Sequence, residues 1–220
     1  MPSTLRHRSL AWLALTASMT PGLAAQAPLR TFLLRNAKDT IAVEQVKRTP
    51  GRLEGDLLLR STNQRLHYVA TLSPDELVVS IENEFRFATD SAGAPARQAV
   101  HVEFVGDSVV VAMAGRGAAP QRVASRLGAL PWINPSFGLA EQAVRRGLVL
   151  KGEAQSLPLF ALAGGTTVLA DLTRVGTDSV LLTLGGVPIH LGITTGGSIR
   201  GGVIPAQGLM LDVIDGAVQN

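Results

Sequence analysis

Two histidines and two glutamates are the residues whose types and spacing could support acid–base chemistry or metal binding. His67 and His101 each stand between two apolar residues, in the sequences Leu-His-Tyr and Val-His-Val. Because side chains alternate along a strand, both imidazoles face away from the apolar sides of their predicted strands. With Glu103 or Glu82 they could form a metal or acid–base cluster. No short-spaced pair such as H-x-H or H-E-x-x-H is present, so we interpret them as two separate histidines on a solvated face.

Ser136 is the candidate nucleophile, because backbone amides at a helix start could hold an oxyanion beside it. No G-x-S-x-G sequence surrounds it, and serine is a frequent helix-capping residue, so we interpret it as a cap. Asp171 and Asp178 lack the Asp-Thr-Gly or Asp-Ser-Gly loop of aspartic proteases. The sequence therefore predicts no catalytic residue, no metal site and no cofactor.

Three aspartates recur in a weak internal repeat: Asp39, Asp107 and Asp178 each end a turn and precede a hydroxyl residue and a β-branched strand start. A functional interpretation would make the three aspartates metal ligands or catalytic acids. The carboxylate of an aspartate commonly accepts hydrogen bonds from turn amides, and β-branched residues favour the strand that follows. The repeat therefore indicates turns that join consecutive strands.

The elements that would position these residues are mostly strands, since apolar residues alternate with polar ones over most of the chain. Alternation predicts strands at residues 53–59, 66–72, 77–81, 100–104, 157–162, 166–174, 179–184, 187–193 and 208–213. Short turn sequences separate these strands, so we expect neighbours to pair as an antiparallel meander. Paired glycines predict tight turns at residues 164–165, 185–186, 196–197 and 201–202.

One segment breaks the strand pattern and predicts a short amphipathic helix. Asn134 is the expected cap, Pro135 the first helical residue and Gly147 the residue near the end. Glu141 and Arg145 are spaced to form an ion pair. The apolar stripe consists of Phe137, Ala140, Val144 and Leu148. Such a stripe must be buried, and we expect it to pack against a concave face of the sheet.

Three aromatic residues are the candidate ligand contacts: Trp132, Phe137 and Tyr68. Trp132 precedes the helix and could line the mouth of a cavity or contact a partner protein, or it could seal the end of the sheet. Phe137 begins the apolar stripe of the helix, and Tyr68 lies on the apolar face of its strand. The sequence leaves these three interpretations of Trp132 open.

The first residues predict export. Arg6 and Arg8 precede a short apolar run and small residues, the order of a secretory signal peptide. We expect cleavage near Ala24 or Ala25, which gives a signal peptide over residues 1–24 and one β-rich domain over residues 25–220. The chain contains no cysteine, and we predict no transmembrane segment after cleavage. The protein is then periplasmic or extracellular.

The charge pattern argues against nucleic acid as a partner. The formal net charge is +3, but loss of Arg6 and Arg8 with the leader leaves 18 basic against 17 acidic residues. Lysine and arginine are scattered and aromatic residues are few, so no strip for phosphates and no platform for bases is visible.

The fold class is therefore mainly β: an antiparallel meander forming a curved sheet or open barrel, with one short amphipathic helix. This architecture resembles the half-open barrels of periplasmic lipoprotein carriers and related uncharacterised secreted β-proteins. In such families apolar side chains line a curved sheet, and helices cover the opening to form a site for acyl chains. The resemblance implies a non-enzymatic binding protein for an apolar small molecule or lipid. The alternatives are a module that binds another envelope protein and, more remotely, a hydrolase without a recognisable motif.

Overall fold

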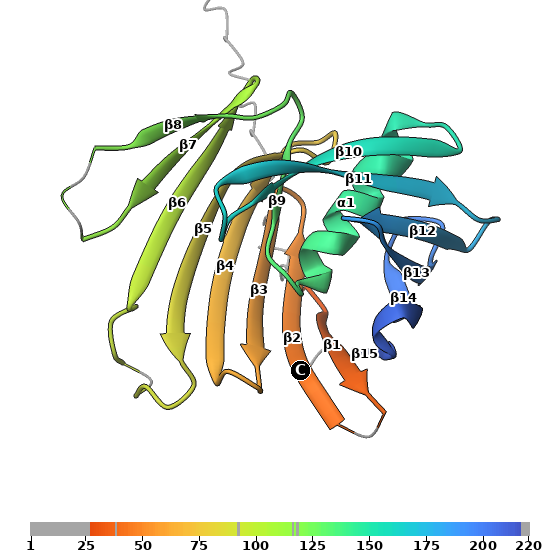
Figure 1. Cartoon of the computed structure of the whole chain (residues 1–220), viewed down its shortest axis with the longest axis horizontal. Helices are drawn as coiled ribbons and strands as arrows, with labels where there is room; N and C mark the ends of the chain where they lie inside the picture. Colours follow the sequence, from red (N-terminus) through yellow and green to blue (C-terminus); the bar gives the residue numbers. More distant parts are fainter. Residues whose placement is uncertain (1–26, 38, 92, 116, 118, 217–220) are drawn as a thin grey trace, which may run out of the picture.

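The structure is a computed structural model that describes residues 27–37, 39–91, 93–115, 117 and 119–216 of the 220-residue chain. The predicted signal peptide, residues 1–24, lies outside the described residues. In the described part, the chain forms one large sheet, the α-helix α1 (Phe137–Leu150) and the short 3-10 helix η1 (Pro205–Gln207) (Figure 1). No helix in these ranges is both long and apolar enough to cross a membrane.

Fifteen strands make up the sheet. The first eight are β1 (Leu29–Asn36), β2 (Asp39–Thr49), β3 (Arg52–Leu59), β4 (Gln64–Leu72), β5 (Val78–Phe87), β6 (Gln98–Val105), β7 (Ser108–Met113) and β8 (Gln121–Ala124). The other seven are β9 (Leu130–Trp132), β10 (Ala154–Ala161), β11 (Thr166–Arg174), β12 (Ser179–Leu184), β13 (Val187–Ile193), β14 (Ile199–Ile204) and β15 (Leu209–Asp215).

The strand order confirms the predicted meander. It runs from β8 back to β1, then from β15 back to β9, so that the first and last strands join the two halves. All neighbours are antiparallel except β9 and β10, which are parallel because α1 connects them. The sheet is strongly curved, and its edge strands β8 and β9 do not pair with each other in the described structure. It is therefore an open curved sheet and not a closed barrel.

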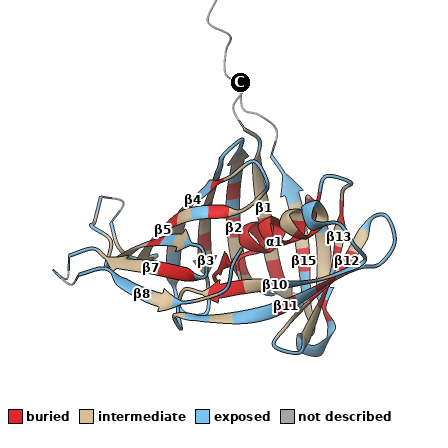
Figure 2. Cartoon of the chain, turned by 90° about the horizontal axis from the view of Figure 1, so that it is seen from above, coloured by how far each residue is buried: buried red, intermediate tan, exposed pale blue. Residues whose placement is uncertain are grey.

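Burial alternates along the strands and shows that the concave face of the sheet encloses the core. In β3, Leu53 and Leu57 are buried, while Glu54 and Asp56 between them lie on the outer, convex face. The concave face surrounds α1, and the residues coloured as buried gather on the helix and on the strands around it (Figure 2). Removal of apolar surface from water on this face is the main stabilising contribution to the fold.

The apolar stripe of α1 packs against the concave face, as predicted. Phe137 and Val144 are buried, and the Phe137 ring lies 6.3 Å from the ring of Phe32 on β1. Glu141 and Arg145 form the predicted ion pair, with 3.4 Å between Nε and Oε1. The Glu141 carboxylate also accepts a hydrogen bond from the backbone N–H of Ile199 at 2.8 Å, which ties the middle of α1 to β14.

Both ends of α1 differ from the prediction. Ser136, and not Asn134, is the N-cap: its Oγ accepts a hydrogen bond from the N–H of Leu139 at 3.2 Å, and the helix begins at the next residue. Gly147 lies within the helix, which continues to Leu150. A Cβ atom at Gly147 would overlap with the side chain of Leu172 on β11, so this glycine serves close packing between helix and sheet.

Three of the four glycine pairs lie in turns as predicted, but the pair Gly201 and Gly202 lies inside β14. A Cβ at Gly202 would lie 2.5 Å from the carbonyl oxygen of His190 on the neighbouring strand β13. The physical requirement at Gly202 is thus close approach of two strands, and not a turn conformation.

Candidate functional site

His67 and His101 lie on the outer face of the sheet, and each contacts a different carboxylate. His67 Nδ1 is 3.4 Å from Asp56 Oδ2, and His101 Nε2 is 3.2 Å from Glu103 Oε1. The hydrogen bond with Asp56 raises the pKa of His67. Within the ranges that the structure describes, no group of three or more His, Asp or Glu side chains is arranged to hold a metal ion. Each of these histidines thus contacts a neighbouring carboxylate of the outer face.

The aspartates of the weak repeat lie at three separate places along the sheet. Asp39 begins β2, Asp107 lies in the turn between β6 and β7, and Asp178 lies in the connection between β11 and β12. The structure does not bring them together, so they form no common site; Asp107 lies in a turn as predicted, whereas Asp39 is the first residue of its strand.

Ser136 belongs to a buried hydrogen-bond network centred on Glu44, which we call the Glu44 anchor. The carboxylate of Glu44 accepts hydrogen bonds from Ser136 Oγ at 2.6 Å, from Tyr68 Oη at 2.8 Å, and from the backbone N–H groups of Phe137 at 2.6 Å and Gly138 at 3.0 Å. Glu44 is 1% exposed and Ser136 is 1% exposed, so neither is accessible to a substrate. The Glu44 anchor attaches the start of α1 to the centre of the sheet.

Opposing effects act on the Glu44 carboxyl. Its burial raises the pKa above the ordinary value, while the four hydrogen-bond donors favour the ionised form and lower it. The positive end of the helix macrodipole also favours a negative charge at this place. Sequence reasoning missed Glu44, although one signal was available: it takes an inward position of β2, between Ala42 and Val46, where the alternation requires an apolar residue.

Two glycines make space for Tyr68 in this network. A Cβ atom at Gly55 would overlap with the Tyr68 ring, and a Cβ atom at Gly138 would overlap with its hydroxyl oxygen. The ring thus lies between β3 and the first turn of α1. Its hydroxyl group is already engaged by Glu44, and burial raises the pKa of Tyr68 well above the ordinary value.

The three aromatic candidates lie in two different places. Tyr68 is 0% exposed and Phe137 is 5% exposed, and both contact Glu44. Trp132 lies apart from them, at the end of β9, where it lines a pocket. Trp132 is therefore the candidate residue that faces space large enough for a ligand.

This pocket, the Trp132 pocket, has a volume of about 410 Å³. Its first wall comes from the concave face of β3 to β6, and its second wall from the connection between β9 and α1 and the turn after β10. The lining residues are Leu59, Gln64, Leu66, Asn83, Phe85, Gln98, Val100, Trp132, Ile133, Asn134, Ala161, Leu162 and Ala163. The volume falls in the range of roughly 300–1,000 Å³ typical of small-molecule sites.

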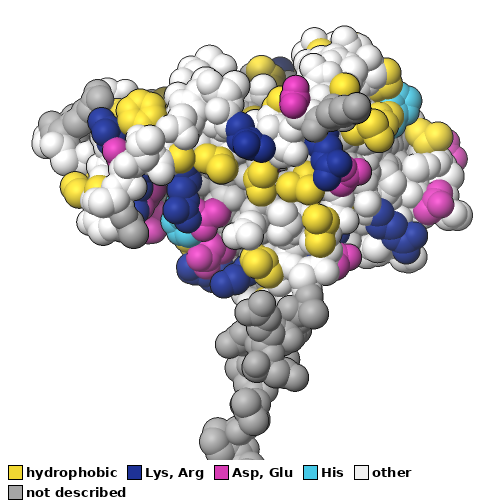
Figure 3. Space-filling model, turned by 90° about the horizontal axis from the view of Figure 1, so that it is seen from below, with side chains coloured by type: hydrophobic (Ala, Val, Ile, Leu, Met, Phe, Trp, Pro, Cys, Tyr) yellow, Lys and Arg dark blue, Asp and Glu magenta, His cyan; other side chains and the backbone are white. Residues whose placement is uncertain are grey.

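The face of the molecule toward which β3 and β5 end is partly apolar. Leu59 and Phe85 lie near the lower ends of β3 and β5 in Figure 1, and Figure 3 shows the molecule from that side. Hydrophobic side chains gather near the middle of this face, with Lys and Arg side chains beside them.

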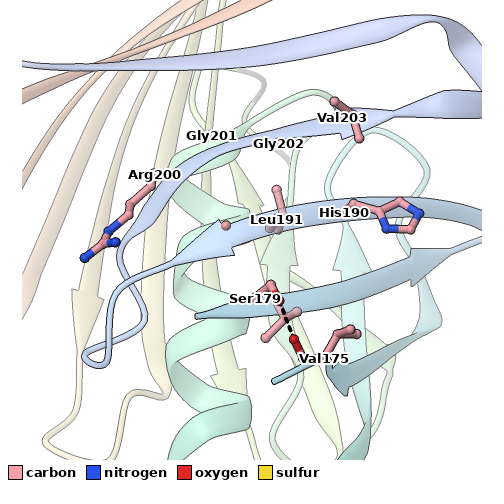
Figure 4. A pocket seen from close by; sticks show the side chains of 10 residues that line it. Val175, Ser179, His190, Leu191, Arg200, Gly201, Gly202 and Val203 are labelled. Atoms are coloured by element: carbon pink, nitrogen blue, oxygen red, sulfur yellow. Dashed lines mark hydrogen bonds between the residues drawn. The ribbon is translucent and has the colours of Figure 1, made fainter. Parts of the chain in front are cut away.

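A second depression lies at β12 to β14 and has a volume of about 390 Å³ (Figure 4). Ser179 and His190 both line it, but the Ser179 hydroxyl donates a hydrogen bond to the carbonyl oxygen of Val175 and not to the imidazole. Figure 4 shows His190, Arg200 and Val203 pointing in different directions from neighbouring strands. The arrangement contains no activated nucleophile.

A side-chain clamp fixes the loop between β5 and β6, next to the Trp132 pocket. Asp90 accepts two hydrogen bonds from the Arg97 guanidinium, at 2.7 and 2.9 Å, and one from the N–H of Phe87 at 2.9 Å. The guanidinium lies 4.6 Å from the centre of the Phe87 ring. The backbone N–H of Arg97 also donates to the carbonyl oxygen of Phe85, one of the pocket residues, at 2.9 Å.

We expect this clamp to be sensitive to acid. The Arg97 hydrogen bonds, together with that of the Phe87 N–H, lower the pKa of Asp90 from 3.8 to about 2. Because the folded value is the lower one, the clamp stabilises the loop above about pH 4 and weakens as the pH falls toward 2. Arg97→Leu should move the pKa of Asp90 upward toward 3.8, as measured by carboxyl-carbon NMR titration. Arg65→Leu is the control, and an unchanged Asp90 titration in Arg97→Leu would contradict the assignment.

Comparison with known proteins finds a similar fold but does not show a function. No protein-family model and no curated protein matches the sequence. A crystal structure of a DUF1089 family protein from Pseudomonas aeruginosa is similar, with a TM-score of 0.57 and 14% identity over 88% of this chain and 95% of that chain. A β-barrel-like protein of the domain of unknown function DUF1849 from Brucella abortus gives a TM-score of 0.47 and 9% identity over 87% and 99%. The chain is thus similar in fold to the DUF1089 family protein, and the likeness to lipoprotein carriers stays a prediction.

Proposed function

We propose that this protein is a non-enzymatic binding protein that holds an apolar or lipid-like ligand in the Trp132 pocket. The observation that carries the proposal is the composition of the pocket: nine of its lining residues are apolar, and they come from both walls. Burial of apolar ligand surface against such walls is favourable. Export of the protein, to the periplasm or the outside of the cell, is part of the proposal, and a purified mass lacking about 24 residues would support it.

The protein scaffold supports this function because α1 does not fill the whole concave face. The Glu44 anchor holds the start of the helix beside β2 and β4, and Glu141 holds its middle against β14. The helix does not cover Phe85 on β5 and Val100 on β6, and these residues line the pocket together with Trp132. The space thus lies beside the anchored helix and does not require the helix to move.

A substitution at the turn after β10 tests the proposal. Ala163 lines the pocket and is exposed, so Ala163→Trp should place an indole across the pocket without disturbing the core. We expect the affinity for the neutral apolar dye N-phenylnaphthylamine to fall by at least about tenfold, since one bulky side chain removes most of the available apolar contact. Dye emission, titrated with the full chain, measures the effect.

The matched control is Ala206→Trp, which adds the same side chain to an exposed position of η1, away from the pocket residues. It should bind the dye as the unchanged protein does. Equal binding by the Ala163→Trp variant, or no dye binding by the unchanged protein, would contradict the proposed site. Native mass spectrometry of the purified protein is an independent test, because a retained lipid would add its own mass.

A second candidate function is the binding of another envelope protein at β8. This strand of four residues forms one edge of the sheet and pairs only with β7 in the described structure, so it could accept a further strand. Crosslinking in cells from a reactive group placed at Gln121 should then give one defined adduct. A strictly monomeric protein without adducts would remove support for this function.

A further inference from the structure

The walls of the Trp132 pocket carry no charge. Among the described residues that line it, none is Asp, Glu, Lys, Arg or His. Charged residues of the same strands alternate with the lining residues and lie on the outer face. There they pair with each other: Arg65 with Asp56 at 3.1 Å, and Arg86 with Glu84 at 2.7 Å. A charged ligand group inside the pocket would therefore find no opposite charge on its walls.

The polar lining residues have one chemical group in common, the carboxamide. Gln64, Asn83, Gln98 and Asn134 are the only polar members of the described lining. A carboxamide offers both donors and an acceptor but no net charge, so it pairs well with hydroxyl groups. The transfer of an unpaired carboxylate into such surroundings is costly, whereas a hydroxyl group that finds hydrogen bonds is tolerated.

Asn83 shows how the carboxamides are placed among the apolar residues. It lies on the inner face of β5, with Tyr68 and Val100 opposite it on the neighbouring strands. Its Oδ1 is buried and has no hydrogen-bond partner among the described residues. The nearby Tyr68 hydroxyl cannot serve it, because that group donates to Glu44. The Oδ1 atom of Asn83 is thus a polar group of the pocket lining that no other described residue engages.

We infer that the Trp132 pocket selects a neutral acyl lipid with a hydroxyl-bearing head, such as a monoacylglycerol, over a fatty acid carboxylate of the same chain length. The inference rests on the proposed binding function and adds the class of ligand. The acyl chain lies against the apolar walls, and the hydroxyl groups bind the carboxamides. Because the described lining holds no cation, a carboxylate finds no charge-assisted hydrogen bond to a side chain of these walls.

Displacement of N-phenylnaphthylamine from the full chain by two probes tests the selection. The probes are monododecanoylglycerol and dodecanoate, compared below their aggregation concentrations at about pH 8, where the carboxylate is ionised. We expect monododecanoylglycerol to bind at least about tenfold more tightly. Equal affinities, or tighter binding of dodecanoate, would overturn the inference but leave the proposed function intact. No displacement by either lipid would count against the proposed function itself.

Introduction of one cation should weaken the preference for the neutral lipid. Gln98 lines the pocket and is exposed, so Gln98→Arg should fold normally, which thermal unfolding by circular dichroism would check. Its guanidinium can pair with a carboxylate at the rim, and dodecanoate affinity should rise at least about fivefold. Gln121→Arg, the same change at an exposed position of β8 outside the pocket, should leave both affinities unchanged. An unaltered dodecanoate affinity in Gln98→Arg would contradict the inference that the carboxamide residues of the pocket bind the polar head of the lipid.

Discussion

Replacement of Glu44 by alanine is expected to lower the free energy of unfolding by about 3–5 kcal/mol, because it leaves several buried donors without an acceptor. Glu44 accepts two side-chain hydrogen bonds, from Tyr68 and Ser136, and two from the first backbone amides of α1. All four donors are buried, so water cannot easily replace the carboxylate. Urea unfolding followed by far-ultraviolet circular dichroism measures the change.

The matched control is Glu54→Ala. Glu54 lies on the outer face of β3, where it pairs with Arg52 at 3.1 Å, and its loss should change the free energy of unfolding by less than about 0.5 kcal/mol. A Glu44→Ala variant as stable as Glu54→Ala would mean that the Glu44 anchor does not hold the helix.

A double-mutant cycle separates the hydrogen bonds from the loss of volume. Tyr68→Phe alone removes one donor and should cost about 1 kcal/mol. In the Glu44→Ala background the same change should cost less, because the hydroxyl group has already lost its acceptor. Additive effects of the two substitutions would show that Tyr68 and Glu44 act independently.

The fold could be predicted because strand alternation is a local property. Leucines at positions 53, 57 and 59 set the inner face of β3 from sequence alone, and the connections were short enough to require a meander. The ends of α1 could not be predicted equally well. Ser136 becomes the cap because Glu44, distant in sequence, also accepts its hydroxyl proton and fixes its position. Tertiary contacts thus decided between two acceptable local caps.

The candidate site was predictable only in part. Trp132 stood out as a large aromatic residue before the helix, and it does line the pocket. The opposite wall, with Asn83 and Phe85, was not foreseeable, because it depends on how far the curved sheet folds over itself. Tyr68 and Phe137 were predicted as ligand contacts because they are aromatic residues on apolar faces, but such faces also form the core of a protein. In the structure both residues are buried in the core, where each donates a hydrogen bond to Glu44.

The substitution Gly202→Ala should be the most damaging change of a single methyl group in the C-terminal half of the sheet. A Cβ atom there would lie 2.5 Å from the carbonyl oxygen of His190 and 2.8 Å from Leu191 Cδ2. The carbonyl belongs to the backbone of β13, so no side-chain rotation relieves the overlap, and β13 and β14 must separate. We expect a loss of about 3 kcal/mol in the free energy of unfolding, measured by urea denaturation.

Gly192→Ala is the control, because it lies on the neighbouring strand β13, where the nearest atom to an added Cβ is 3.9 Å away. It should be tolerated, with a change below about 1 kcal/mol. Since β14 also carries Ile199, whose N–H binds Glu141 of α1, displacement of β14 should loosen the helix as well as the sheet. Hydrogen exchange of the α1 amides should therefore accelerate in Gly202→Ala but not in Gly192→Ala. Equal free energies of unfolding and equal exchange rates of the α1 amides in the two variants would contradict this role of Gly202.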